Sequence, residues 1–107
     1  TLLLTTVGCK SGAPRMLPLI YGQDGDDYII VASKGGFPEH PAWYNNLVAQ
    51  PEVQVQVAAD KFAARATTIG GERRQKLWDI MAEIWPPYID YQQKTDRHIP
   101  VVVLARD

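Results

Sequence analysis

The sequence predicts a small α+β domain that is mainly β: an antiparallel barrel with helices packed on one side. Two observations lead to this prediction. Strand-like segments outnumber helical ones, and most connections between them are short enough for hairpins. The 107 residues fit a single domain over residues 1–107, and 46% of them are apolar, which is enough for a hydrophobic core.

The first third of the chain predicts three strands. Leu2–Val7 contains residue types of high β propensity and is followed by a loop with two glycines and a proline. Arg15–Tyr21 predicts a second strand, and Tyr28–Ala32 is expected to be its antiparallel partner. The Asp-Gly pair between these two segments favours the positive φ of a hairpin turn.

A helix and a second hairpin follow a glycine-rich loop. Pro41 suits the first turn of a helix, which we expect over Ala42–Ala49 because Pro51 prevents it from continuing. Valines alternate with glutamines in Val53–Val57, which is the period of a strand with one buried face. Phe62–Thr68 is the expected antiparallel partner of that strand.

The last third predicts two helices and a final strand. One apolar stripe at helical spacing is formed by Leu77, Ile80, Met81, Ile84 and Trp85. Two prolines end that helix, and a short amphipathic helix is expected over Tyr88–Lys94. Ile99–Leu104 is a nearly continuous apolar run, which is typical of a central strand covered on both faces.

Charge and cysteine content exclude several classes of protein. The formal net charge is −1, and the absence of a basic excess argues against a nucleic-acid partner. No apolar run approaches the roughly 20 residues of a membrane span, and no signal peptide is visible. Cys9 is the only cysteine, so an internal disulfide is excluded and a reducing, cytoplasmic setting is expected. Because Thr1 opens directly into a strand, we expect a preceding native segment.

Two loops that follow strands carry residue types that bind anions. Lys10, Ser11 and Arg15 lie within six residues and offer positive charge and a hydroxyl, with glycines that permit close backbone approach. The segment Ser33-Lys34-Gly35-Gly36 repeats this chemistry after another strand. We expect both loops to meet at one rim of the barrel and clamp a ligand with several negative charges. Two unrelated solvated turns are the alternative.

Aromatic residues on the predicted helices are candidates for the wall of a planar ligand site. Tyr88 and Tyr91 are three residues apart, so a helix places them on one face, with rings and hydroxyl donors together. Hydrophobic capping of the barrel is the alternative for this pair. Trp43 is expected in the core, whereas the roles of Tyr44 and Asn45 stay open.

Other polar residues predict no metal site and no nucleophile. His40 and His98 are isolated, without a matching His, Cys or carboxylate at ligand spacing. No Ser-His-Asp or Cys-His arrangement stands out. Thr95-Asp96-Arg97 predicts a structural turn with a local ion pair.

Several segments, taken in order, resemble a known family. They are LLTTVGCKSGAPR at 3–15, ASKGG at 32–36, HPAWYNNL at 40–47, then Tyr91, TDR at 95–97 and IPVV at 99–102. Together they resemble the deazaflavin-dependent nitroreductase family of actinobacteria, over essentially the whole chain. The resemblance implies a split β-barrel, like that of FMN-binding oxidoreductases. It also implies the cofactor F420, an 8-hydroxy-5-deazaflavin with a phosphate and a polyglutamate tail.

The activity that the resemblance implies is hydride transfer from reduced F420 to an organic acceptor such as a quinone, an activated enone or a nitro-aromatic. The expected donors to the acceptor oxygen, where negative charge develops, are Ser33, Tyr88 and Tyr91. The implied phosphate contacts are Lys10, Ser11 and Arg15, with Cys9 contributing at most its backbone. The implied contacts of the ring system are Met16, Leu17, Pro18, Leu19 and Ile20 along it; Val31, Ala32, Ser33 and Lys34 beside it; and Ala42, Trp43, Tyr44, Asn45 and Asn46 on one side. Tyr88 is a further implied contact.

The chain departs from the family at Cys9, where relatives usually have arginine. Loss of a bidentate phosphate donor there is expected either to weaken the binding or to shift it toward Lys10 and Arg15. Relatives often begin with an amphipathic helix, so peripheral contact with the inner face of the membrane, through the preceding segment, is a further expectation. The alternatives are an FMN-dependent oxidoreductase of the same fold, a non-catalytic carrier of deazaflavin or lipid, and an interaction domain that binds neither. The oligomeric state stays open.

Overall fold

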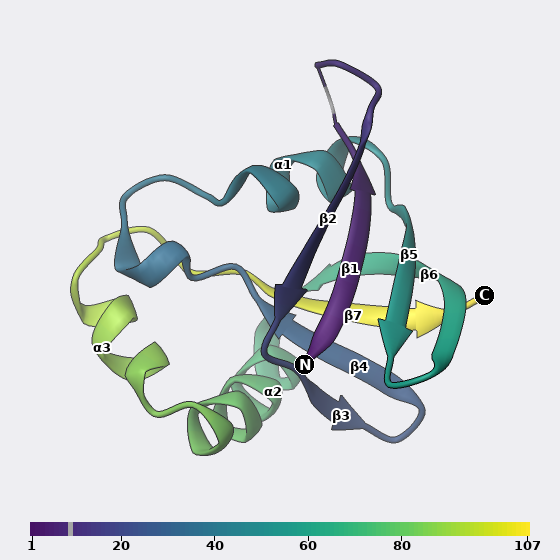
Figure 1. Ribbon diagram of the computed structural model, residues 1–107. Helices are drawn as coiled ribbons and strands as arrows, with labels where there is room; N and C mark the ends of the chain where they lie inside the picture. The colour runs from purple at the N-terminus through teal and green to yellow at the C-terminus, as the bar shows by residue number, and fades with distance from the viewer. Residues whose placement is uncertain (9) are drawn as a thin grey trace.

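The computed structural model describes residues 1–8 and 10–107, so the predicted cofactor contact at Cys9 lies outside the described residues. Within this part of the chain, seven strands form one antiparallel sheet in the order β2-β1-β5-β6-β7-β4-β3. Figure 1 shows the sheet curling into a half-barrel, with β1, β2 and β5 running across β7, β4 and β3. The elements are β1 (Leu2–Val7), β2 (Pro14–Leu19), β3 (Gly22–Asp24), β4 (Asp27–Val31), the 3-10 turn η1 (Lys34–Gly36), α1 (Ala42–Ala49), β5 (Glu52–Val57), β6 (Asp60–Ile69), α2 (Gly71–Ile84), α3 (Pro87–Gln93) and β7 (Val101–Arg106).

Strand β1 illustrates how alternation in the sequence builds the inside of the half-barrel. Its even-numbered side chains are buried, and its odd-numbered ones are half-buried. The register places Leu4 between Leu17 of β2 and Val55 of β5, so apolar side chains meet on one face. Trp43 and Leu47 join the same interior cluster. Helix α1 therefore supplies side chains to the inside of the curled sheet.

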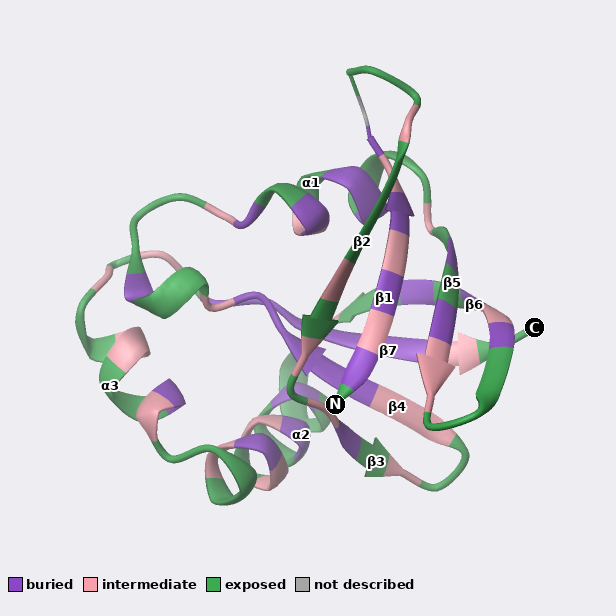
Figure 2. Ribbon diagram, viewed as in Figure 1, coloured by how far each residue is buried: buried purple, intermediate pink, exposed green. Residues whose placement is uncertain are grey.

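A second apolar cluster lies on the outer face of β4 and β7, where α2 and α3 pack. Leu77 and Met81 of α2 and Tyr88 of α3 belong to one cluster with Val101 and Val103 of β7. Figure 2 shows β7 buried along most of its length. Because residues of β7 contribute to both clusters, the strand is covered on both faces, as its continuous apolar run predicted.

The segment predicted as a single strand over Arg15–Tyr21 forms parts of two separate strands. β2 ends at Leu19 and pairs with β1, whereas the Asp-Gly hairpin joins β3 to β4. The predicted pairing of residues 15–21 with residues 28–32 is therefore wrong. β2 and β3 lie at opposite edges of the sheet, so the chain crosses the open side of the half-barrel between them. Gly22 suits this crossing, because a Cβ there would lie 2.6 Å from Met81 Sδ.

The helices follow the sequence prediction closely. Helix α1 spans Ala42–Ala49, and α3 begins and ends one residue earlier than the predicted Tyr88–Lys94. Trp85 was expected on the apolar stripe of the preceding helix. It lies just beyond the end of α2 and is 40% exposed. No helix in the described part of the chain has the length and apolar character to span a membrane.

Candidate functional site

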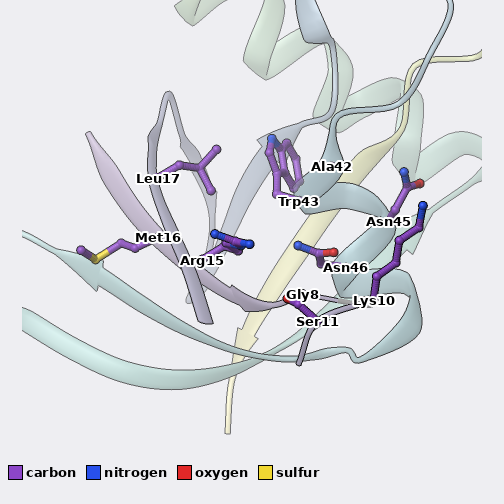
Figure 3. Close-up of a pocket in the computed structure, with 10 residues that line it drawn as sticks. All are labelled: Gly8, Lys10, Ser11, Arg15, Met16, Leu17, Ala42, Trp43, Asn45 and Asn46. Atoms are coloured by element: carbon purple, nitrogen blue, oxygen red, sulfur yellow. The ribbon is translucent and has the colours of Figure 1, made fainter. Parts of the chain in front are cut away.

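Two pockets adjoin along β2 and share Trp43. The first, of about 640 Å³, lies between β2, the loop before it and α1 (Figure 3); the second, of about 380 Å³, lies between the end of β2, the loop after β4 and α3. Both volumes are in the range of small-molecule sites. The residues predicted from the sequence divide between them: Lys10, Ser11, Arg15, Met16, Leu17, Ala42, Trp43, Asn45 and Asn46 line the first, and Pro18, Leu19, Ile20, Val31, Ser33, Lys34, Trp43, Tyr88 and Tyr91 line the second.

The first pocket carries two exposed cations, Lys10 and Arg15. Within residues 1–8 and 10–107, neither has a carboxylate at ion-pair distance, unlike Arg65, whose Nη1 lies 3.1 Å from Glu52 Oε1. Figure 3 shows Arg15 on one side of the pocket and Trp43 on the other. The charge of both cations is therefore available to an anionic group in this pocket.

Hydrogen bonds join the described residues of the loop before β2 across its two sides. Gly8 N–H donates to Ala13 O at 2.8 Å, and Gly12 N–H donates to Gly8 O at 2.8 Å. Ser11 Oγ accepts the N–H of Ala13 at 3.2 Å. The φ of Gly12 is 72°, a conformation that glycine adopts at little cost. The loop therefore presents its cation and hydroxyl from a defined position beside β2.

The opposite wall of the first pocket is formed by α1. Trp43 and Asn46 are both buried, and Asn46 Nδ2 donates to Thr6 Oγ1 at 3.2 Å, which ties the helix to β1. Met16 and Leu17 of β2 add apolar surface. A pocket with cations at its rim and apolar side chains along its walls suits a ligand that joins an anionic group to a flat ring system.

The second pocket brings together the three predicted catalytic side chains. Ser33 lies on the loop after β4, whereas Tyr88 and Tyr91 lie on α3, more than fifty residues later. The two tyrosine rings meet edge to face, with centroids 6.2 Å apart. Tertiary structure thus gathers three hydroxyl-bearing residues at a pocket that is otherwise lined mainly by apolar residues.

Lys34 lines the second pocket rather than the first. Its Nζ lies 3.9 Å from Glu39 Oε2 and 5.9 Å from the centre of the Phe37 ring. The two basic loops therefore line two adjoining pockets, not the single rim that we expected. Of the three predicted cations, Lys10 and Arg15 line the first pocket and Lys34 lines the second.

Two predicted cofactor contacts, Ala32 and Tyr44, line neither pocket. Ala32 is fully buried in the interior cluster. The hydroxyl of Tyr44 lies 2.9 Å from Thr68 Oγ1, and its ring packs against His40 with centroids 4.8 Å apart. The structure therefore places both residues in contacts between elements of the fold.

Tyr88 is the most buried of the three hydroxyl-bearing residues in the second pocket. Its ring packs against Trp78 and Tyr91, with centroids 6.2 Å away in each case. Burial, with a smaller contribution from Tyr91, raises the pKa of Tyr88 to about 12. The phenol is protonated at neutral pH, as a tyrosine of ordinary pKa also is, and the shift delays its ionisation in alkali.

The raised pKa of Tyr88 predicts a loss of stability in alkali. A phenol that is held neutral stabilises the fold below its ordinary pKa of 10.0, and this contribution is lost as the pH rises toward 12. Tyrosinate absorbance can be titrated against pH in the wild type and in Tyr88→Phe. The difference between the two curves gives the ionisation of Tyr88, and we expect its midpoint near pH 12. A difference curve centred near 10 would show that Tyr88 is solvated.

Arg97 is the residue that the sequence analysis misjudged most clearly. It was expected to form a local ion pair, but its guanidinium donates to Ala32 O at 3.0 Å and Ser33 O at 2.7 Å, more than sixty residues earlier. No local pattern signals these bonds, because their acceptors are backbone carbonyls whose positions depend on the tertiary fold.

Gly36 lies where the loop after β4 approaches α3 most closely in its neighbourhood. We therefore expect Gly36→Ala to lower the stability of the fold more than Gly35→Ala. Its φ is 81°, and a Cβ there would lie 2.6 Å from the backbone oxygen of Tyr91. Gly35 has a φ of 62°, but a Cβ there meets no described atom within 4 Å. We expect Gly35→Ala to cost about 1 kcal/mol of unfolding free energy and Gly36→Ala about 2 kcal/mol or more. Equal shifts in denaturation midpoint would contradict this.

Comparison with known proteins identifies the family. The sequence matches the family described as F420H2-dependent quinone reductase over residues 1–106. It is 45% identical over 109 residues to the F420H2-dependent quinone reductase Rv1261c of Mycobacterium tuberculosis, which covers 99% of this chain and 73% of that protein. A solved structure described as an F420-H2 dependent reductase (FDR-A) matches with a TM-score of 0.89 and 44% identity, over 96% of this chain and 91% of the other.

A second solved structure, described as a domain-swapped dimer, matches with the same TM-score of 0.89 and 44% identity, over 96% of this chain and 78% of the other. The agreement with these structures confirms the predicted split-barrel fold. The chain therefore belongs to the F420H2-dependent quinone reductase family.

Proposed function

We propose that this chain binds reduced coenzyme F420 and transfers a hydride from it to a quinone-like acceptor. The observation that carries the proposal is the pairing of two pockets. One has the cations Lys10 and Arg15 beside apolar walls, and it adjoins, through Trp43, a second pocket with three hydroxyl groups. The relatives, described as an F420H2-dependent quinone reductase and an F420-H2 dependent reductase, support the same cofactor and reaction.

The first pocket suits the anionic part and the ring system of F420. Lys10 and Arg15 would hold a phosphate through charge-assisted hydrogen bonds. Met16, Leu17 and Trp43 offer apolar surface to a flat ring. When bound, F420H2 supplies the hydride as a two-electron donor, and the protein supplies placement and electrostatics.

The second pocket suits the acceptor. Ser33, Tyr88 and Tyr91 offer O–H donors to an acceptor oxygen that gains negative charge as the hydride arrives. Tyr88 is the most buried of the three residues, so little water would compete for a hydrogen bond from its hydroxyl. Ile20 and Trp85 add apolar surface that limits the access of water. Because apolar contacts dominate, we expect activated enones and nitro-aromatics to be accepted beside quinones.

Side-by-side binding and turnover measurements test this function. We expect fluorescence titration to show F420 binding at least about tenfold more tightly than FMN. We also expect oxidation of F420H2 by the purified chain to depend on an added quinone. Tighter binding of FMN would indicate a flavin enzyme, and F420 binding without turnover would indicate a carrier. Binding of neither cofactor would leave an interaction domain.

A further inference from the structure

We propose that Arg97 is a positioning residue for the second pocket: together with Gln92, it joins the loop that carries Ser33 to the helix that carries Tyr91. We call this pair the Gln92–Arg97 brace. Its consequence for catalysis rests on the proposed function, whereas its mechanical role is independent of any cofactor. Neither Arg97 nor Gln92 lines either of the two pockets described above, so the role is exerted through other residues.

The guanidinium of Arg97 reaches both ends of the loop between β4 and α1. Nη1 donates to Ala32 O at 3.0 Å, Nη2 donates to Ser33 O at 2.7 Å, and Nε and Nη2 donate to Phe37 O at 3.2 and 3.1 Å. Nη1 also lies 2.9 Å from His40 Nδ1. A planar group with five N–H donors in a fixed arrangement can satisfy these four partners at once.

The loop gains from such outside support because one residue in it, Lys34, adopts a backbone conformation that is costly for a residue with a Cβ. Lys34, Gly35 and Gly36 have φ values of 46°, 62° and 81°, so three successive residues adopt the left-handed conformation. Lys34 has a Cβ, which makes this conformation costly. Inside the loop, Gly36 N–H donates to Ser33 O at 3.0 Å and Phe37 N–H donates to Lys34 O at 3.1 Å. The hydrogen bonds from Arg97 add to these two local bonds in holding the shape that places Ser33 and Lys34 at the pocket.

Gln92 anchors the other end of the brace to α3. Its Nε2 donates to Arg97 O at 2.7 Å, and its Oε1 accepts the N–H of Ile99 at 3.0 Å. The N–H of Arg97 also donates to Thr95 Oγ1 at 3.1 Å. Gln92 follows Tyr91 directly in α3. One wall of the second pocket is thus connected to the other through two side chains.

The charge of Arg97 is held without a carboxylate. Within the described residues, no acidic side chain lies at ion-pair distance from it, and carbonyl oxygens surround it instead. His40 Nδ1 must accept rather than donate, which requires a neutral ring. Burial and the charge of Arg97 lower the pKa of His40, which favours that neutral form. A lysine ammonium would supply the charge, but it could not reach the same acceptors in one plane.

The variants Arg97→Lys and Arg97→Ala test the brace, with Arg74→Lys as the matched control. Arg74 is buried, whereas Arg97 is half-buried, and it too donates to a backbone carbonyl, Ile99 O, at 2.7 Å, which lies outside the loop between β4 and α1. Hydrogen exchange needs no cofactor. We expect the amides of residues 34–37 to exchange at least about tenfold faster in Arg97→Lys than in the wild type or Arg74→Lys. We expect those of β5 and β6 to be unchanged.

The kinetic measurement separates positioning from general damage. Each variant is assayed at the same interval below its own Tm, so that differences in stability do not affect the comparison. Under these conditions Arg97→Lys should lower kcat/KM for the quinone by about tenfold or more. Its affinity for F420 should change by less than about threefold. Added ethylguanidinium should partly restore kcat/KM in Arg97→Ala, and ethylammonium should not.

Unchanged exchange at residues 34–37 in Arg97→Lys would overturn the brace, as would a parallel loss of F420 affinity and kcat/KM. The proposed function has a separate outcome. If the wild type does not oxidise F420H2 with a quinone but Arg97→Lys accelerates exchange in the loop, the function fails and the mechanical role of the brace stands.

Discussion

Replacing Arg15 with alanine is expected to weaken F420 binding by about tenfold or more, with a smaller change in kcat at saturating cofactor. Arg15 is exposed at the first pocket, and no described carboxylate neutralises it. Its guanidinium can therefore form charge-assisted hydrogen bonds with a phosphate. Because hydride transfer would take place away from the phosphate, the substitution should act on binding more than on chemistry. Fluorescence titration and steady-state assays measure the two effects separately.

Arg65→Ala is the matched control for this prediction. Arg65 is also an exposed arginine, but it pairs with Glu52 on β5 and lines neither pocket. The control should bind F420 as the wild type does. Raising the ionic strength should weaken binding by the wild type more than by Arg15→Ala, because salt screens the lost interaction. Unchanged affinity in both Arg15→Ala and Lys10→Ala would mean that the phosphate lies elsewhere.

Replacing Trp43 with alanine is expected to cost about 3–5 kcal/mol of unfolding free energy. The indole is only 7% exposed, belongs to the interior cluster and borders both pockets, so its removal leaves a cavity that the curled sheet cannot close. For a domain of this size, that loss corresponds to a Tm lower by roughly 15–30 °C. Thermal unfolding followed by circular dichroism measures it.

Trp85→Ala gives the comparison within the same residue type. Trp85 borders the second pocket but is 40% exposed, so we expect a loss of about 1 kcal/mol or less. Trp43→Phe should retain most of the unfolding free energy. Because the phenyl ring is smaller than the indole, this variant should also widen the opening between the two pockets. Equal losses in Trp43→Ala and Trp85→Ala would contradict the assignment of Trp43 as the structural link between the pockets.

The elements that follow from local pattern were predictable from the sequence. Pro41 and Pro51 bracket α1, alternating valines predict β5, and the apolar run at 99–104 predicts a strand covered on both faces; all three are present. Each depends on residue types and spacing within a few positions, which act through backbone conformation and the burial of one face. The partner of the segment after Arg15 was not predictable in this way, because it depends on which sheet edge the strand joins.

The sequence by itself determined the mainly β class, the bounds of α1 and the residue types at the two pockets. Only the tertiary structure decided how these residues are distributed between the two pockets. It placed Lys10 and Arg15 at one pocket and Lys34 at the other, gathered Ser33 with Tyr88 and Tyr91, and put Arg97 against carbonyls of a distant loop. The physical reason is that periodicity and propensity report on neighbours along the chain. A pocket, by contrast, depends on the order of the strands in the sheet and on contacts with backbone N–H and C=O groups. Because nearly every residue carries these same two groups, the sequence does not indicate which of them a side chain will reach.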